Sequence, residues 1–448
     1  MRGPLDPLLL DDRPEKEPWQ GLKDLAYRLA RDLPQYPASS PLLISGEWGL
    51  GKTSLLWEVQ RQLTSMEAVR PRVGGQTLHR VLVFEAWRYE GELPLLLALV
   101  RYLWSGIGPL KDLKPEDVGK GKEIWKDLWD ASVALAVGMG PGLAQLAIGP
   151  LGASAIQSLV QFRKETREGT PEETSEKEFA RLTADATEQL WCKFRELINH
   201  FWPTADRPLI ILIDDLDRCS PSGAVSLLDS IRLILAKASD LNCRFVVALD
   251  RGVLSMAVAN KFADLGHYEG NRYLEKIFPV SFDLPRPGRQ DVARLIEDLL
   301  AQLRNGNAAE HLEVLHKAFV DPIFANPRLV KRCINRFLML LRFESDNNDA
   351  GKTPAKASED ELRKRIILVQ WMAACERWPA LRRLLSRRNS NYWERVRMAL
   401  GDPNQKLPDT DAETLLMQPD LQTWLSFHLA EGAEPLYQAE QRLQRWGL

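Results

Sequence analysis

The chain has 448 residues, of which 45% are hydrophobic and 27% are charged, as in an ordinary globular protein. This length accommodates about two or three domains. Lysine and arginine total 59 against 61 aspartate and glutamate residues, which gives a formal net charge of -2. The overall charge therefore makes no case for nucleic acid or anionic lipid, and nucleic acid is not expected as a partner.

The five cysteines are scattered, without a Cys-x-x-Cys pair or a nearby histidine cluster. This spacing argues against a zinc site and against a disulfide framework, and it suits a reducing compartment. The N-terminal stretch MRGPLDPLLLDDRPEKEP lacks the apolar run of ~7–15 residues that a secretory signal requires. We expect a cytoplasmic protein, with a peripheral position at the inner membrane face as the open alternative.

A glycine-rich stretch, GEWGLGKTS, spans residues 46–54 and follows the apolar run PLLIS at 41–45. In a phosphate loop, glycines let backbone N–H groups surround phosphates, a lysine adds positive charge and the next hydroxyl ligates magnesium. Leu55, Val59 and Leu63 then recur at steps of four, which indicates a helix. The pattern predicts a strand, a phosphate loop and a helix that bind ATP with Mg²⁺. The expected nucleotide-binding residues are Gly46, Glu47, Trp48, Gly49, Leu50, Gly51, Lys52, Thr53 and Ser54, and Thr53 is also an expected metal ligand.

A second strand is predicted at 79–87, and a helical insert of about residues 105–200 follows it. Within the insert, residues 131–160 carry no charge. Lys52, before the insert, and Asp214, after it, are both expected at one magnesium ion and so on the same side of any membrane. The insert could therefore cross a membrane only an even number of times. Two helical spans need ~20 residues each, and this shorter run contains Pro141 and Pro150, so no spanning hairpin is expected. Three interpretations stay open: a glycine-rich hairpin packed on the core, an oligomer contact, or a re-entrant or surface membrane anchor.

The stretch RPLIILIDDLDR contains an apolar run, Leu209–Ile213, of the kind found in a parallel strand covered on both faces. Asp214 and Asp215 follow at its carboxyl end, where ligands bind in open α/β sheets. We expect Asp214 to hold the magnesium and Asp215 to polarise the attacking water. Asp217, two residues after Asp215, competes for the second role.

Two more strands are predicted at 243–251 and 278–285. Alternation of strands and helices predicts a three-layer α/β fold with a parallel five-stranded sheet. With carboxylates on the third strand, the fourth is expected between that strand and the strand of the phosphate loop. Asp250, at the tip of the fourth strand, would then face the γ-phosphate as a sensing residue, or it would cap the following helix.

Helical periodicity replaces the strands from about Pro287, and residues 343–360 form a polar stretch without periodicity. The predicted domains are a P-loop core at 1–286, an all-α lid at 287–343, a linker loop at 344–358 and a helical bundle at 359–448. In the bundle, arginines flank Tyr392 and Trp393, which would suit a nucleic-acid backbone, but a solvated basic face is the favoured interpretation.

Together these motifs resemble the KAP family of P-loop NTPases. The resemblance covers roughly residues 40–340 and rests on six motifs: GEWGLGKT, EAWRYE, IDDLDR, FVVALD, YLEKIFPVSFDLP and NPRLVKRCINRF. It implies an ATPase core with a C-terminal helical lid. It also implies that some members associate with membranes and that bacterial members exclude phages or plasmids.

By position, the resemblance makes Arg218 a candidate to stabilise transition-state charge, in its own subunit or in a neighbour, with a surface salt bridge as the alternative. Arg328 matches the lid arginine that related ATPases place against the phosphates. Trp87 and Tyr89 are expected to pack beneath the nucleotide site.

The sequence and the resemblance favour an ATP-hydrolysing conformational switch or motor subunit in bacterial defence, acting as a homo-oligomer with an effector protein. One alternative is a slow nucleotide-binding scaffold or a membrane-associated signalling protein with little turnover. The other is a nucleic-acid-associated ATPase.

Overall fold

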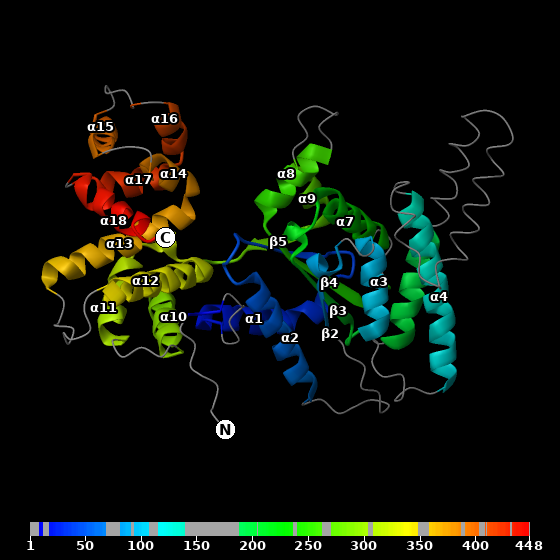
Figure 1. Ribbon diagram of the computed structural model, residues 1–448. Helices are drawn as coiled ribbons and strands as arrows, with labels where there is room; N and C mark the ends of the chain where they lie inside the picture. The colour runs from blue at the N-terminus through cyan, green and yellow to red at the C-terminus, as the bar shows by residue number, and fades with distance from the viewer. Residues whose placement is uncertain are drawn as a thin grey trace, which may run out of the picture. The chain divides into compact units, whose positions relative to one another are not determined.

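The structure is a computed structural model of the chain, which forms two compact units (Figure 1). The sheet unit comprises Lys16–Glu47 and Lys52–Leu284, and the helical unit comprises Met1–Glu15, Trp48–Gly51 and Pro285–Leu448. The structure describes residues 9–11, 18–68, 81–90, 94–106, 115–138, 188–203, 205–235, 240–261, 270–302, 308–347, 358–386, 390–402, 408, 410–430 and 432–447.

The sheet unit is built on a parallel five-stranded sheet in the order β2-β3-β4-β1-β5. Because β4 pairs with both β1 and β3, the predicted fold and the predicted place of the fourth strand are confirmed. The carboxyl ends of β1 and β3 thus lie on the same side of the sheet, and only β4 separates these two strands. The strands are β1 (Leu42–Ser45), β2 (Val81–Glu85), β3 (Leu209–Asp214), β4 (Cys243–Leu249) and β5 (Val280–Asp283).

Burial differs between the centre and the edge of this sheet. Every residue of β3 is buried, which agrees with its continuous apolar sequence. At the edge, β5 is shorter than the predicted strand, and its Val280 side chain is exposed. The central strands are therefore the buried part of the sheet, and the candidate site lies at their carboxyl ends.

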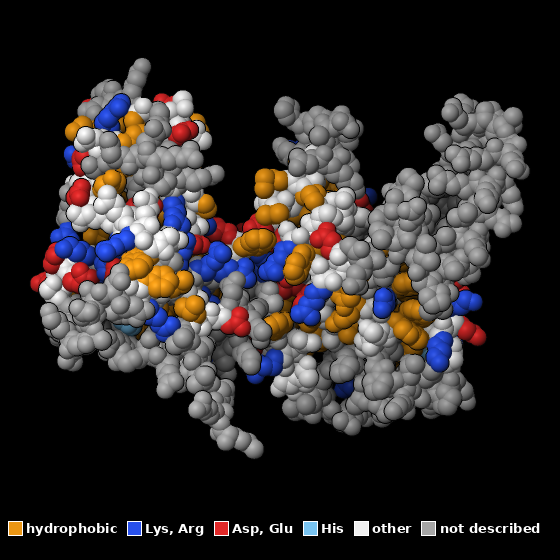
Figure 2. Space-filling view, viewed as in Figure 1, with side chains coloured by type: hydrophobic (Ala, Val, Ile, Leu, Met, Phe, Trp, Pro, Cys, Tyr) orange, Lys and Arg blue, Asp and Glu red, His pale blue; other side chains and the backbone are white. Residues whose placement is uncertain are grey.

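Helices cover the sheet and continue its hydrophobic core. α2 packs against β2, β3 and β4, and α1 packs on α2, while α3 contacts β2 and α7 (Figure 1). Apolar side chains reach the surface over α8, where Val253 and Met256 are exposed (Figure 2). The α-helices are α1 (Gln20–Asp32), α2 (Lys52–Ala68), α3 (Leu95–Gly106), α4 (Pro115–Gly138), α7 (Pro221–Leu235), α8 (Arg251–Lys261), α9 (Gly270–Ile277) and one over residues 188–201. The 3-10 helices are η1 (Leu33–Gln35), η2 (Ala86–Tyr89) and η4 (Leu216–Arg218).

The described part of the insert is helical and is held together by aromatic contacts. The Trp125 ring lies 5.1 Å from that of Trp104 and 5.8 Å from that of Trp129, which joins α3 to α4. Of the apolar run predicted at 131–160, residues 131–138 end α4, and the rest lies outside the described residues. No helix in the described ranges is both long enough and apolar enough to cross a membrane.

The helical unit packs its helices around one hydrophobic core. The predicted lid at 287–343 and the predicted bundle at 359–448 both contribute to it, because α11 and α12 pack against α13. α12 also continues to Asn347, into the range predicted as a linker loop. The elements are α10 (Arg289–Ala301), α11 (Ala308–Ala318), η6 (Pro322–Phe324), α12 (Pro327–Asn347), α13 (Glu359–Arg377), α14 (Pro379–Ser386), α15 (Ser390–Gly401), α16 (Thr410–Leu416), α17 (Pro419–His428) and α18 (Glu434–Gln444).

The aromatic residues of the predicted basic face are core residues. Tyr392 is 9% exposed and Trp393 is 1% exposed, so neither ring is available to stack on a nucleic-acid base. On the same helix, Arg397 pairs with Glu394 at 2.6 Å. The solvated basic face itself stays a prediction.

A short N-terminal segment is bound along α12 in the helical unit. The Asn335 side chain accepts a hydrogen bond from the Leu10 N–H group at 2.7 Å and donates to the Leu10 carbonyl at 2.9 Å. Lys331 Nζ donates to the Asp11 carbonyl at 3.0 Å, and the Leu10 side chain is buried. Asn335 therefore satisfies both backbone groups of Leu10.

We expect Asn335→Asp to loosen this segment, because a carboxylate still accepts from Leu10 N–H but no longer donates to its carbonyl. A lost hydrogen bond of about 1 kcal/mol corresponds to about fivefold faster amide exchange at Leu10, measured by hydrogen exchange. Asn271→Asp is the control, since the exposed Asn271 only accepts from Arg251. Equal exchange at Leu10 in both variants would show that Asn335 does not hold the segment.

Candidate functional site

The glycine-rich loop leaves β1 at the carboxyl edge of the sheet and enters α2 at Lys52. The Gly46 N–H group donates to the Leu249 carbonyl at 3.2 Å, so pairing between β1 and β4 continues into the loop. Gly49 and Gly51 have φ values of +88° and +97°, which side chains disfavour. Both positions therefore require glycine, whereas the binding of phosphate by this loop stays a prediction.

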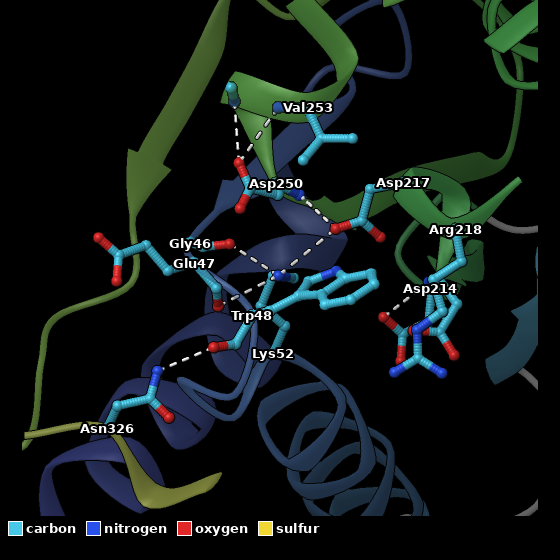
Figure 3. A network of polar contacts seen from close by, with 12 residues as sticks. Gly46, Glu47, Trp48, Lys52, Asp214, Asp217, Arg218, Asp250, Val253 and Asn326 are labelled. Atoms are coloured by element: carbon cyan, nitrogen blue, oxygen red, sulfur yellow. Dashed lines mark hydrogen bonds and ion pairs between the residues drawn. The ribbon is translucent and has the colours of Figure 1, made fainter. Parts of the chain in front are cut away.

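Within the helical unit, the loop tip is in close contact with the start of α12. Asn326 Nδ2 donates to the Trp48 carbonyl at 2.8 Å (Figure 3). A Cβ atom at Gly49 would lie 2.5 Å from Asn326 Oδ1 and 2.6 Å from the Arg328 Cβ atom. Asn326 Oδ1 also accepts from the N–H groups of Arg328 and Leu329, so one side chain caps α12 and binds the loop.

The Lys52 side chain is buried and lies across its own loop (Figure 3). Its ammonium donates to the carbonyls of Gly46 at 2.7 Å and Glu47 at 3.4 Å. The Asp217 carboxylate is the charged partner, at 3.7 Å. The ammonium is thus bound by its own loop and by Asp217, and its role toward the outer phosphates stays a prediction.

Asp214 ends β3, and its carboxylate is almost completely buried. Oδ1 accepts a hydrogen bond from the Asp215 N–H group at 2.9 Å, whereas Oδ2 is buried without a hydrogen-bond partner. The Thr53 hydroxyl, on the second residue of α2, lies close enough to this carboxylate to lower its pKa. The two residues predicted to ligate the metal are therefore neighbours, although they are distant in sequence.

Burial raises the pKa of Asp214 from its ordinary 3.8 to about 6, and the Asp215 charge adds to this rise. The hydrogen bonds from Thr53 and the Asp215 backbone, and the Lys52 charge, oppose it. A buried oxygen without a partner is unfavourable unless something binds it.

The oxygen atoms at this place suit magnesium. Mg²⁺ prefers hard oxygen ligands and is commonly bound through one or two protein groups together with substrate phosphates and water. The hydroxyl of Thr53 and the unpartnered oxygen of Asp214 meet that description. No cluster of three or more His, Cys, Asp or Glu side chains suited to a metal occurs among the described residues, so an all-protein cage is not formed there.

Asp215 and Arg218, both predicted to serve catalysis, are paired with each other. Arg218 Nε lies 3.0 Å from Asp215 Oδ1, and both side chains are partly exposed. Asp215 has a φ of +56°, an uncommon left-handed backbone conformation for a residue other than glycine. In this state the carboxylate expected to orient water is engaged by the arginine expected to stabilise charge.

Asp217 and Asp250 take different places from Asp215. The Asp217 side chain is 1% exposed, and its Oδ2 accepts from the Asp250 N–H group at 2.8 Å (Figure 3). Asp250 Oδ1 accepts from the N–H groups of Gly252 at 2.9 Å and Val253 at 3.4 Å. Of the two roles left open for Asp250, the structure shows the helix cap, since these are the first amides of α8.

The remaining predicted residues fall outside this group. Arg328 belongs to the first turn of α12 in the helical unit, and its role toward phosphate stays a prediction. Tyr89 stacks on Phe84 with ring centroids 5.1 Å apart, as expected of a packing residue. The expectation for Trp87 is wrong: it is 53% exposed, because η2 turns Ala86 inward and Trp87 outward.

The sequence analysis assigned no role to two residues that make contacts near the candidate site motifs, Glu90 and Asn326. Glu90, from the motif EAWRYE, accepts a hydrogen bond from the Ser220 N–H group just before α7. Asn326 precedes a proline at a helix start, and that pattern is the sequence signal for a capping residue. The pairing of Asn326 with Trp48 has no such signal, because 278 residues separate them.

We expect Asp214→Asn to stabilise the metal-free protein at pH 8. Because the folded-state pKa is raised, stability falls as the pH rises from about 4 to about 6 and stays lower above that range. The substitution removes the buried charge, a gain on the order of 3 kcal/mol at pH 8 that vanishes near pH 4. Thermal unfolding in EDTA at both pH values measures it, and a loss of stability at pH 8 would contradict the assignment.

Comparison with known proteins identifies the family. A model described as the KAP family P-loop domain matches residues 25–343. The phage T7 exclusion protein of Escherichia coli (strain K12) is 26% identical over 312 residues, which cover 66% of this chain and 37% of that protein. This chain therefore spans well under half the length of that relative.

Two solved structures of the Aeropyrum pernix ORC2 protein are also similar over most of the chain. The ADPNP-ADP complexes give a TM-score of 0.39 and 12% identity, covering 96% of this chain and 85% of that one. The ADP form gives 0.37 and 13%, covering 97% and 96%. Both TM-scores are low, so neither structure bears on the ligand of this chain. The family model alone covers more than half of the sequence, and with it the phosphate loop and the acidic strand, so the chain belongs to the KAP family of P-loop NTPases.

Proposed function

We propose that this chain binds ATP with Mg²⁺ at the carboxyl edge of the sheet and hydrolyses it. One observation supports this most strongly: the Thr53 hydroxyl and the buried Asp214 carboxylate lie together beside Lys52, and one carboxylate oxygen lacks a partner. A phosphate chain with its metal would supply that partner. Membership of the family and the conformation of the loop support the same conclusion.

Each residue has a distinct part in the proposed reaction. Lys52 offsets negative charge on the outer phosphates, and Thr53 and Asp214 would hold the magnesium, which neutralises charge that develops during phosphoryl transfer. Asp215 would orient the attacking water, and Arg218 would stabilise the transition state. Since Asp215 and Arg218 are paired at 3.0 Å, their pair must open or turn together before water is activated.

This pair favours a second candidate, a nucleotide-binding switch with slow turnover. If opening of the Asp215–Arg218 pair limits the rate, the protein holds ATP for long periods and hydrolyses it only when a partner releases the pair. Phosphate release by the purified chain, alone and with cell extract, distinguishes the two. The ATPase reading predicts turnover without extract, and the switch reading predicts turnover only with it.

We further propose that the chain acts in defence against phages or plasmids, as a homo-oligomer with an effector protein. The name of the relative, a phage T7 exclusion protein, supports this, together with the family match. The match covers 37% of that relative, so the proposal does not extend to the rest of the relative's length.

Lys52→Ala and Asp215→Asn are expected to separate binding from turnover. Loss of the lysine charge should weaken ATP binding by about tenfold or more, while Asp215→Asn should retain binding and lower kcat by about 100-fold. Calorimetry and phosphate release measure these effects. Lys193→Ala, which removes a lysine paired with Asp127 and Glu196, is the control. Equal loss of ATP binding in the two site variants would contradict the division of roles.

In cells that express the chain, we expect fewer plaques from an excluded phage, with phage T7 as the first tested. Lys52→Ala should restore plaque numbers because the response needs bound nucleotide, whereas the Lys193→Ala control should not. Protein levels are matched by immunoblot. Protection by Lys52→Ala equal to that of the unchanged chain would exclude a nucleotide-dependent defence.

A further inference from the structure

Asp217 carries the further inference, which rests on the proposed nucleotide chemistry. It lies on η4, directly after the acidic strand, and its side chain is 1% exposed. A carboxylate this deeply buried remains charged only if nearby groups compensate it. The described contacts identify two such groups from different parts of the sheet unit.

The first group is the ammonium of Lys52. Asp217 Oδ2 lies 3.7 Å from Lys52 Nζ, and the lysine side chain is only 9% exposed. The same ammonium donates to the carbonyls of Gly46 and Glu47, which are neutral, and its charge also acts on the Asp214 carboxylate. Because the pair is shielded from water, each charge constrains the position of the other more than a surface pair would.

The second group is the backbone at the tip of β4. The same oxygen of Asp217 accepts from the Asp250 N–H group at 2.8 Å, and the Asp250 carboxylate caps α8 through Gly252. A continuous set of contacts therefore leads from Lys52 through Asp217 to the start of α8 (Figure 3). The helix dipole and the capped amides make that helix start sensitive to charge.

Asp215 makes a different set of contacts. Its carboxylate pairs with Arg218, and its backbone is left-handed, whereas the Asp217 carboxylate pairs with Lys52. Asp215 and Asp217, which were both candidates for one role, thus have different charged partners. Asp217 Oδ2 accepts one hydrogen bond, from the Asp250 N–H group, and forms one ion pair, with Lys52, which suits a group that holds others in place.

We propose that Asp217 is a positioning residue: it holds the Lys52 ammonium over the phosphate loop and joins it, through the Asp250 N–H group, to the start of α8. When a phosphate group binds Lys52, the lysine ammonium is shared between that phosphate and Asp217. Asp217 still accepts the hydrogen bond from the Asp250 N–H group. The positions of Lys52 and of the β4 tip are therefore linked. We expect ATP hydrolysis to depend on Asp217 more strongly than ATP binding does.

The substitution Asp217→Asn isolates the charge, since the amide oxygen still accepts from Asp250 N–H. Glu58→Gln is the matched control, because Glu58 is also buried, lies on α2 with Lys52 and is paired with Arg61. In the nucleotide-free chain, a double-mutant cycle of Lys52→Met with Asp217→Asn is measured by urea unfolding. We expect the unfolding equilibrium constants to deviate from additivity by about fivefold or more, whereas the cycle of Lys52→Met with Glu58→Gln is additive.

The second measurement is turnover with MgATP. Asp217→Asn is expected to lower kcat by about tenfold or more with KM within about threefold, because loss of alignment affects the transition state more than the bound state. Glu58→Gln should leave both unchanged. A Lys52–Asp217 cycle that is additive, or a kcat for Asp217→Asn equal to that of the control, would overturn the proposal.

The two measurements also separate this proposal from the proposed function. A chain that neither binds nor hydrolyses MgATP would refute the nucleotide chemistry, and the unfolding cycle would still decide whether Asp217 holds Lys52. A non-additive cycle would then support the positioning contact, and an additive cycle would refute it as well.

Discussion

The structure depends on keeping opposite charges buried at the edge of one sheet. Lys52 follows β1, Asp214 ends β3 and Asp217 follows it, so the charges meet because β4 alone separates β1 from β3 in the sheet. Burying them costs free energy that the apolar strands offset, since β3 is buried along its whole length. Asp214 keeps one unpartnered oxygen, which is unfavourable for stability and suits a site that binds a metal and phosphate.

Much of the sheet was predictable because its signals are local. Continuous apolar runs identified β1, β3 and β4, and the spacing of the glycines and Lys52 identified the loop. Side-chain partners were harder to predict. Asp215 and Asp217 differ by two positions, and nothing in the local sequence shows that Asp217 is the one that pairs with Lys52. In the same way, η2 turns Trp87 outward, although strand-end aromatics usually pack inside.

The two ends of the loop have different kinds of partner. Lys52, at its C-terminal end, contacts a carboxylate that also binds the start of α8. At its tip, within the helical unit, Trp48 accepts a hydrogen bond from Asn326, and Gly49 has no room for a side chain. The loop thus has a charged partner at its C-terminal end and a helix-capping side chain at its tip.

The central claim is that the loop and Asp214 together form one magnesium–nucleotide site. Calorimetric titration of the unchanged chain with ATP, in magnesium and in EDTA, tests it most directly. We predict saturable binding of one nucleotide per chain, weakened by about tenfold or more in EDTA because the unpartnered Asp214 oxygen then lacks its metal. Absence of saturable binding, or the same affinity with and without magnesium, would contradict this account of the site.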